Sequence, residues 1–201
     1  MKALAYQGPK HVEVVTKPDP RIEHPGDAIV RVTRAAICGS DLHLYHGLVP
    51  DTRVGHTFGH EVTGVVQEVG RAVTTLRPGD RVVVPFNISC GSCFFCERGL
   101  TASCDRTNPN SQIVGGVYGP PWNLVPIGVA MNKGLTLRGA QCSVRRYMPH
   151  LLEHIRAGRI DAKAVISHRL PLDDAAKGYH MFANKQDDCL KCVLLPNGGA
   201  A

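Results

Sequence analysis

Four cysteines in the middle of the chain have a spacing that could hold a metal ion. Cys90, Cys93, Cys96 and Cys104 follow the pattern C-x2-C-x2-C-x7-C. Two-residue gaps let successive thiolates turn back onto one ion, and four thiolates complete a tetrahedral zinc shell with no open position for a substrate. The surrounding segment, residues 87–106, has little apolar sequence. We therefore expect a structural zinc ion to fold it, with a binding free energy of about 10–16 kcal/mol, as in zinc-finger peptides.

An iron–sulfur cluster is the alternative for this cysteine group, because bacterial ferredoxins also contain C-x2-C-x2-C. In those proteins the next cysteine follows after three residues and precedes proline. Here Cys104 follows after seven residues and precedes Asp105, so the spacing favours zinc. Three of the remaining cysteines, Cys142, Cys189 and Cys192, are interpreted as small, half-buried residues without a chemical role.

A second group of potential metal ligands lies closer to the N-terminus. Cys38 begins the run Cys-Gly-Ser-Asp-Leu-His, which ends at His43, and His60 lies between Gly59 and Glu61. A thiolate and an imidazole are both ligands that zinc prefers. A lone cysteine or histidine most often serves packing, so neither segment predicts a site by itself.

Together, these segments resemble the zinc-dependent alcohol dehydrogenases of the medium-chain dehydrogenase/reductase family. Four motifs occur in the family's order: Cys-Gly-Ser-Asp-x-His from Cys38, Gly-His-Glu-x-x-Gly from Gly59, Pro-Gly-Asp-Arg-Val from Pro78, and the four-cysteine segment. The resemblance covers residues 1–118. Short runs at 85–87 and 108–110 are most similar to the formaldehyde-dehydrogenase-like branch.

The resemblance implies a role for each matching residue. Cys38 and His60 are expected to bind a catalytic zinc ion, which acts as a Lewis acid on an alcohol or aldehyde oxygen. Glu61 matches the family glutamate that can move onto the metal. Asp41 is expected to orient a ligand imidazole. The Ser40 hydroxyl matches the group that accepts the substrate proton, and His43 matches the end of that relay.

Three of these residues have simpler interpretations that the sequence leaves open. Ser40 could serve only to cap a short helix. His43 could be a surface histidine, and Glu61 could be one partner of an ion pair.

The resemblance also implies NAD(P) as cofactor, held by a Rossmann domain inserted into the catalytic domain. That domain carries a G-x-G-x-x-G turn, whereas no two glycines in this sequence are separated by one residue. We infer an internal deletion near residue 119 that removed the Rossmann domain and the family's next catalytic zinc ligand. Gly39, Ser40 and Lys191 match cofactor-contacting positions, but we expect them to be insufficient to hold the dinucleotide.

The elements that must position these groups are mostly strands. Val- and Ile-rich runs bounded by Gly, Pro and Asp turns predict strands over 2–6, 12–15, 28–36, 61–69, 81–85, 165–170 and 190–195. Helices are expected over 40–46, 149–157 and 173–184, the last capped by Asp173 or Asp174. The fold class predicted with the family is α+β, mainly β: a GroES-like irregular β-barrel without a Rossmann domain.

Two segments are expected along the chain. Residues 1–118 would form the GroES-like catalytic domain, and residues 119–201 the C-terminal remainder after the deletion. Apolar residues left uncovered by the loss, at positions 124, 125, 127 and 129, predict self-association into a homo-oligomer.

Composition limits the other partners and the location of the protein. The net charge of +6 comes from scattered Lys and Arg, which does not indicate nucleic-acid binding. No apolar run reaches 18 residues and Met1-Lys2-Ala3-Leu4 lacks a signal-peptide core. We therefore expect a cytoplasmic protein without a membrane partner, acting on a small alcohol or aldehyde.

Overall fold

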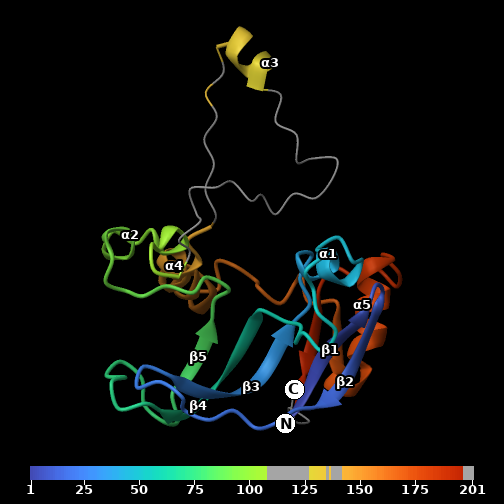
Figure 1. Cartoon of the computed structure of the whole chain (residues 1–201), viewed down its shortest axis with the longest axis horizontal. Helices are drawn as coiled ribbons and strands as arrows, with labels where there is room; N and C mark the ends of the chain where they lie inside the picture. The colour runs from blue at the N-terminus through green and yellow to red at the C-terminus, as the bar shows by residue number, and fades with distance from the viewer. Residues whose placement is uncertain (108–126, 135, 137–141, 197–201) are drawn as a thin grey trace. The chain divides into compact units, whose positions relative to one another are not determined.

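The computed structural model describes residues 1–107, 127–134, 136 and 142–196 (Figure 1). Within these residues the protein is mainly β with few helices, as predicted, and contains no Rossmann domain. Two compact units divide the chain: residues 1–84 with 161–201, and residues 85–160. Segments from both ends of the chain therefore build the first unit. The predicted boundary after residue 118 lies outside the described residues and stays a prediction.

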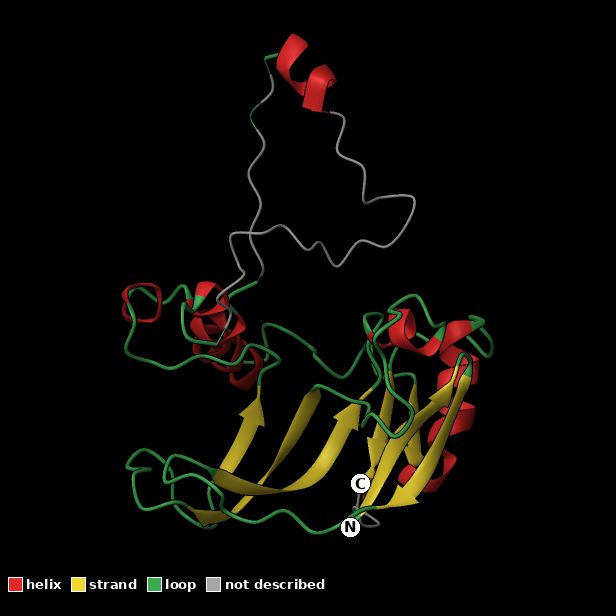
Figure 2. Ribbon diagram, viewed as in Figure 1, coloured by secondary structure: helices red, strands yellow, loops and turns green. Residues whose placement is uncertain are grey.

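The first unit is built on two sheets (Figure 2). Strands β1 (Lys2–Gly8) and β2 (His11–Thr16) form an antiparallel pair. A five-stranded sheet has the order β5 (Arg81–Val84), β4 (Glu61–Val69), β3 (Ala28–Ala36), β7 (Cys192–Leu195) and β6 (His168–Pro171). Its neighbours are antiparallel except β6 and β7, which run parallel. A bridge between Ala5 and Thr57 connects β1 to the loop before β4.

Strands β3 and β4 have the predicted bounds because their β-branched residues suit a half-buried pleated surface. Their register shifts at two places, between Ile29 and Val30 and between Val32 and Arg34. Opposite them, Gly64 lies so close to β3 that a Cβ would stand 2.5 Å from the Arg31 carbonyl oxygen. Glycine at this position permits the close approach of the two strands.

The core of the first unit lies between the β1–β2 pair and helix α5 (Ala175–Ala183). Its aromatic centre is Tyr179, which lies 5.7 Å from the Tyr45 ring and 5.6 Å from the Phe58 ring, centroid to centroid. Ile37 is fully buried and belongs to the same cluster. Ile37 directly precedes Cys38, and Tyr45 is the last residue of helix α1 (Asp41–Tyr45), which follows it. The core therefore contains residues on both sides of Cys38.

Some predicted bounds in the C-terminal segment differ from the structure. The strands predicted over 165–170 and 190–195 are the shorter β6 and β7. The helix predicted over 173–184 is a 3-10 turn η2 (Leu172–Asp174) followed by α5. Asp174 occupies the N-cap position but makes no side-chain capping bond. Asp173 instead accepts hydrogen bonds from Lys2 Nζ at 2.7 and 2.8 Å.

The second unit contains the cysteine-rich segment and the longest helix. Its described elements are α2 (Phe94–Glu97), η1 (Thr101–Ser103), α3 (Ile127–Asn132) and α4 (Val144–Arg156). The apolar spacing predicts this helix over 149–157. The helix begins five residues earlier, with Ser143 as N-cap, and accommodates Pro149 in its interior. No described helix is both long enough and apolar enough to cross a membrane.

Of the apolar residues expected to drive self-association, Leu124 and Val125 lie outside the described residues, and so does the side chain of Ile127. Val129, on α3, is 50% exposed.

Candidate metal centres

The four cysteines of the second unit converge on one point. Their sulfur atoms all lie within 4.8 Å of one another, and none of the four forms a disulfide. The Cys93 and Cys104 sulfurs are 4.0 Å apart, whereas a disulfide needs about 2.05 Å. Tetrahedral zinc with bonds of about 2.3 Å to sulfur requires about 3.8 Å between sulfurs. The residues therefore fit a four-thiolate zinc ion.

Local backbone geometry produces this convergence. Gly91 adopts a φ of +81° between the first two cysteines, a left-handed conformation that glycine adopts without steric cost. Cys93 is the N-cap residue of α2 and Cys96 lies inside that helix. One helical turn thus brings these two sulfurs to the same side, and the loop after η1 returns Cys104 to them.

The surroundings favour thiolate at two of the four positions. Hydrogen bonds from the Thr107 side chain and from the Cys90 N–H lower the pKa of Cys104 to about 5. Backbone N–H groups of Cys96 and Asp105 lower the pKa of Cys93. Burial instead raises the pKa of Cys96 to about 11. A divalent cation deprotonates a thiol that coordinates it, so the set suits a metal although Cys96 alone would be neutral.

The second candidate centre lies at one end of the sheet in the first unit. One ligand atom each from Cys38, His60 and Glu61 lies within 4.8 Å of the others. The register of β3 and β4 explains the meeting, because Ala36 pairs with Glu61. Cys38 therefore follows the end of β3 where His60 leads into the start of β4. These three residues could hold a zinc ion.

Asp41 connects two of these ligand residues through a buried carboxylate that is 3% exposed. Its Oδ2 accepts the Cys38 N–H at 3.0 Å, and its Oδ1 lies 3.0 Å from Nδ1 of His60. A carboxylate beside Nδ1 fixes the proton there and leaves Nε2 as the lone-pair nitrogen for a metal.

Asp41 also affects the nearby Tyr179. Burial raises the pKa of the Tyr179 hydroxyl, and the negative charge of Asp41 and a hydrogen bond to its carboxylate raise it further.

Ser40 and His43 lie on the same turn as Cys38. Ser40 occupies the N-cap position of α1 with helical backbone angles, but its side chain makes no capping bond. Its oxygen instead lies 3.7 Å from the Cys38 sulfur. His43 is half-buried on α1, and in the described part of the chain no hydrogen bond joins its ring to Ser40. Gly39 is exposed between Cys38 and Ser40.

Lys191 joins this centre, which the sequence did not indicate. Its Nζ donates to Oε2 of Glu61 at 2.6 Å, and both side chains are half-buried. The sequence identified Lys191 as a cofactor-phosphate contact and left an ion pair open for Glu61 without naming its partner. The two residues are 130 positions apart, so no local pattern connects them. Contact of Lys191 with a cofactor stays a prediction.

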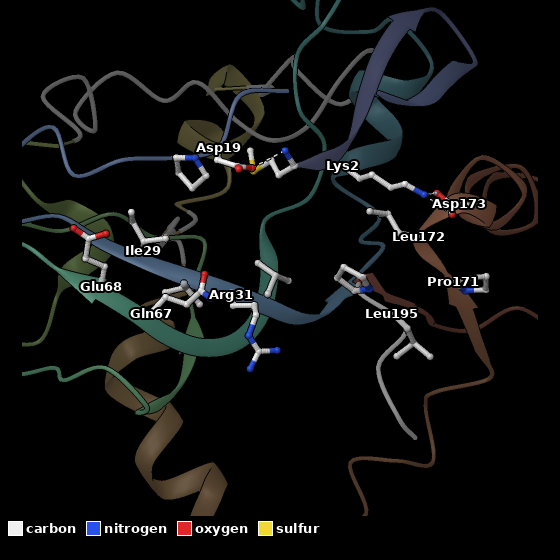
Figure 3. A pocket seen from close by; sticks show the side chains of 15 residues that line it. Lys2, Asp19, Ile29, Arg31, Gln67, Glu68, Pro171, Leu172, Asp173 and Leu195 are labelled. Atoms are coloured by element: carbon white, nitrogen blue, oxygen red, sulfur yellow. Dashed lines mark hydrogen bonds and ion pairs between the residues drawn. The ribbon is translucent and has the colours of Figure 1, made fainter. Parts of the chain in front are cut away.

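An open pocket elsewhere in the first unit contains none of the predicted site residues (Figure 3). Its lining includes the Lys2–Asp173 ion pair, Arg31 on β3 and Glu68 on β4. The pocket and the Cys38 centre share no residues.

Comparison with known proteins identifies residues 24–144 as a match to the alcohol dehydrogenase GroES-like domain. The uncharacterized zinc-type alcohol dehydrogenase-like protein AdhB of Bacillus subtilis is 52% identical over 119 residues, 59% of this chain and 31% of that protein. Glutathione-independent formaldehyde dehydrogenase of Pseudomonas aeruginosa is 40% identical over 124 residues, 59% of this chain and 30% of that protein.

Solved structures show the same fold. The alcohol dehydrogenase TADH from Thermus sp. ATN1 aligns with a TM-score of 0.80 at 23% identity, over 98% of this chain and 100% of that chain. A zinc-dependent alcohol dehydrogenase from Streptococcus pneumonia, in its apo form, aligns with a TM-score of 0.72 at 18% identity, over 100% of both chains. By sequence, however, the chain spans about a third of the length of the curated relatives named above.

Proposed function

The chain belongs to the alcohol dehydrogenase GroES-like domain family, and on that premise we propose that it is the zinc-binding catalytic part of an alcohol or aldehyde oxidoreductase. The observation that supports this most is the meeting of Cys38, His60 and Glu61 within 4.8 Å. Cys38 and His60 offer a thiolate and an imidazole, two groups that zinc prefers, and the buried Asp41 carboxylate lies beside the imidazole. Structural centres are normally closed by four protein ligands, whereas catalytic ones keep a position open.

In this proposal Cys38 binds zinc through its sulfur and His60 through Nε2, and Glu61 supplies a carboxylate at the same place. Zinc bound there would polarise the oxygen of an alcohol or aldehyde as a Lewis acid. The four-cysteine group would hold a second, structural zinc ion, since four thiolates leave no open position.

The surrounding side chains prepare the Cys38 centre for a substrate. Asp41 fixes both the Cys38 backbone and the His60 ring, which holds the two ligands in one orientation. We propose the Ser40 hydroxyl as proton acceptor because it lies beside the Cys38 sulfur and is not used for capping. His43, one turn along α1, would pass the proton toward solvent.

Hydride transfer also requires a nicotinamide cofactor, for which the sequence carries no G-x-G-x-x-G turn. We therefore propose that turnover by this chain alone is impaired. A non-catalytic zinc-binding GroES-like module is the second candidate. It is favoured by the missing G-x-G-x-x-G turn. Binding of NAD(H) distinguishes the two.

Cobalt substitution tests the proposal directly. Removing zinc and titrating with Co²⁺ should give two equivalents per chain, each with thiolate-to-metal absorption, because cobalt replaces zinc at such ligands. Cys38→Ser should abolish one equivalent and Cys104→Ser the other. Imidazole or a short alcohol should alter only the spectrum of the site that contains Cys38. A single equivalent that survives Cys38→Ser would refute the catalytic centre.

A further inference from the structure

The Lys191 backbone is hydrogen-bonded to a serine from a different part of the chain. The backbone of Lys191 is engaged on both sides by Ser167, which lies 24 residues earlier. The Lys191 carbonyl accepts the N–H groups of Ser167 at 3.1 Å and His168 at 3.2 Å. The Ser167 hydroxyl oxygen accepts the N–H groups of Leu190 at 2.9 Å and Lys191 at 3.2 Å. These bonds fix the Lys191 backbone immediately before β7 begins.

Counting donors and acceptors shows how the Ser167 hydroxyl is itself oriented. A serine hydroxyl has one proton and two lone pairs, and both lone pairs face the N–H groups of Leu190 and Lys191. Its proton then points to Nδ1 of His168, 2.9 Å away, or to the more distant Lys191 carbonyl at 3.2 Å. The other ring nitrogen of His168, Nε2, lies 3.0 Å from a carboxylate oxygen of Asp187.

A hydroxyl with this many partners costs free energy to lose, because its partners are left unpaired. If Ser167 served only the local turn, its contacts would have no consequence for other residues. The Lys191 side chain, however, leaves this turn to reach the carboxylate of Glu61, which lies in the candidate metal group. Ser167 therefore contacts the backbone of the residue whose ammonium lies beside a potential metal ligand.

From these contacts we infer that Ser167, oriented by His168, is a positioning residue that holds the Lys191 ammonium on Glu61 and so sets the charge at the Cys38 centre. An ammonium paired with Glu61 neutralises that carboxylate and weakens its attraction for a cation at the same place. Displacing Lys191 leaves the carboxylate free to attract the cation. The predicted effect on metal binding rests on the proposed function, whereas the connection from Ser167 through Lys191 to Glu61 does not depend on metal.

Chemical labelling of Lys191 tests the connection without metal. Metal-free full-length protein is acetylated with an N-hydroxysuccinimide ester, and the rate at Lys191 is measured by peptide mass spectrometry. Ser167→Ala should raise that rate about fivefold, as loss of one or two hydrogen bonds implies, and Glu61→Gln should raise it similarly. Combining them should add little, because both release the same contact. Ser167→Thr, which keeps the hydroxyl, should restore the wild-type rate.

A matched control removes another hydroxyl-to-backbone bond in the same unit. Thr33 Oγ1 donates to the Thr63 carbonyl at 3.2 Å, and Thr33→Val should leave the Lys191 rate unchanged. Melting curves of every variant show whether the fold persists. Equal Lys191 rates in folded wild type and Ser167→Ala would overturn the inference, as would full additivity of Ser167→Ala with Glu61→Gln.

Titration with Co²⁺ then separates this inference from the proposed function. Ser167→Ala should tighten Co²⁺ binding at the site that contains Cys38 about two- to fivefold, because the carboxylate is no longer neutralised. The gain should vanish in the Glu61→Gln background. If Co²⁺ does not bind there while the labelling result holds, the proposed function fails and the positioning by Ser167 stands. If Co²⁺ binds and labelling shows no connection, the reverse is true.

Discussion

Nδ1 of His60 lies 3.0 Å from Oδ1 of Asp41, a carboxylate that is almost entirely buried. The other oxygen of the same carboxylate accepts the Cys38 N–H. One side chain thus contacts both residues that we propose as zinc ligands. Because a buried carboxylate is costly unless its charge is satisfied, Asp41 favours the arrangement in which both contacts are made.

The Asp41→Asn variant should weaken metal binding at the Cys38 centre about 10- to 100-fold, the usual effect of losing a carboxylate behind a ligand imidazole. An amide keeps the shape but removes the charge that fixes the Nδ1 proton. Competition between the protein and a chromophoric chelator for Co²⁺ measures the change. Asp80→Asn is the control, since Asp80 accepts the Arg77 N–H in a turn away from the ligands. Equal affinities for wild type and Asp41→Asn would contradict this account.

Replacing Cys104 with serine should remove the structural zinc ion and unfold the cysteine-rich segment. Cys104 is fully buried, and its sulfur accepts the Cys90 N–H. The lost binding energy is a large part of the about 10–16 kcal/mol typical of such sites. Metal analysis should fall by one zinc per chain, and proteolysis within the segment should accelerate. Cys142→Ser, at an exposed cysteine, should change neither. Iron with a visible absorption band in wild-type protein would instead indicate a cluster.

Stability should fall above pH 9 because of a buried thiol. Burial raises the pKa of Cys192 to about 11 from its ordinary 9.0. The folded state therefore favours the neutral thiol. Below pH 9 the Cys192 thiol is neutral in both the folded and the unfolded chain. As the pH rises from 9 toward 11, the thiol ionises more readily in the unfolded chain, so the free energy of unfolding falls. Two pKa units correspond to about 2–3 kcal/mol.

Urea unfolding of zinc-loaded protein between pH 8 and 11 measures this effect. Cys192→Ala should flatten the pH dependence, while the exposed Cys142→Ala should retain it. Tyr45 and Tyr179, whose pKa values are also raised by burial, contribute equally in all three proteins. The same slope in Cys192→Ala as in wild type would exclude the thiol as the cause.

Calorimetric titration with NAD(H) or NADP(H) should show no saturation, and oxidation of short alcohols or formaldehyde should stay near background. Orientation of reactants can contribute about 7–11 kcal/mol to lowering a barrier, and the sequence lacks the glycine turn that would hold the dinucleotide. A full-length zinc-dependent alcohol dehydrogenase provides the positive control for both assays. Micromolar cofactor affinity with zinc-dependent turnover would show that this chain is a working dehydrogenase.

The sequence by itself identified the groups whose geometry is local. The four cysteines are separated by two or seven residues, so a short chain segment can bring all four sulfurs to one point. The bounds of β3 and β4 also followed from sequence, since Val-rich runs between turns allow few alternatives. The pairing of Cys38 with His60 came from motifs rather than from reach. The structure adds that the register of Ala36 with Glu61 brings them to one end of the sheet.

Only the tertiary structure decided which distant side chains complete the site. Glu61 and Lys191 are 130 residues apart, and Ser167 holds Lys191 through backbone groups that no side-chain pattern reveals. Such contacts depend on the antiparallel pairing of β7 with β3 and its parallel pairing with β6. A shift of one residue in that register would turn the side chains to the opposite face. Local propensity carries no information about that choice, because packing of the whole unit determines it.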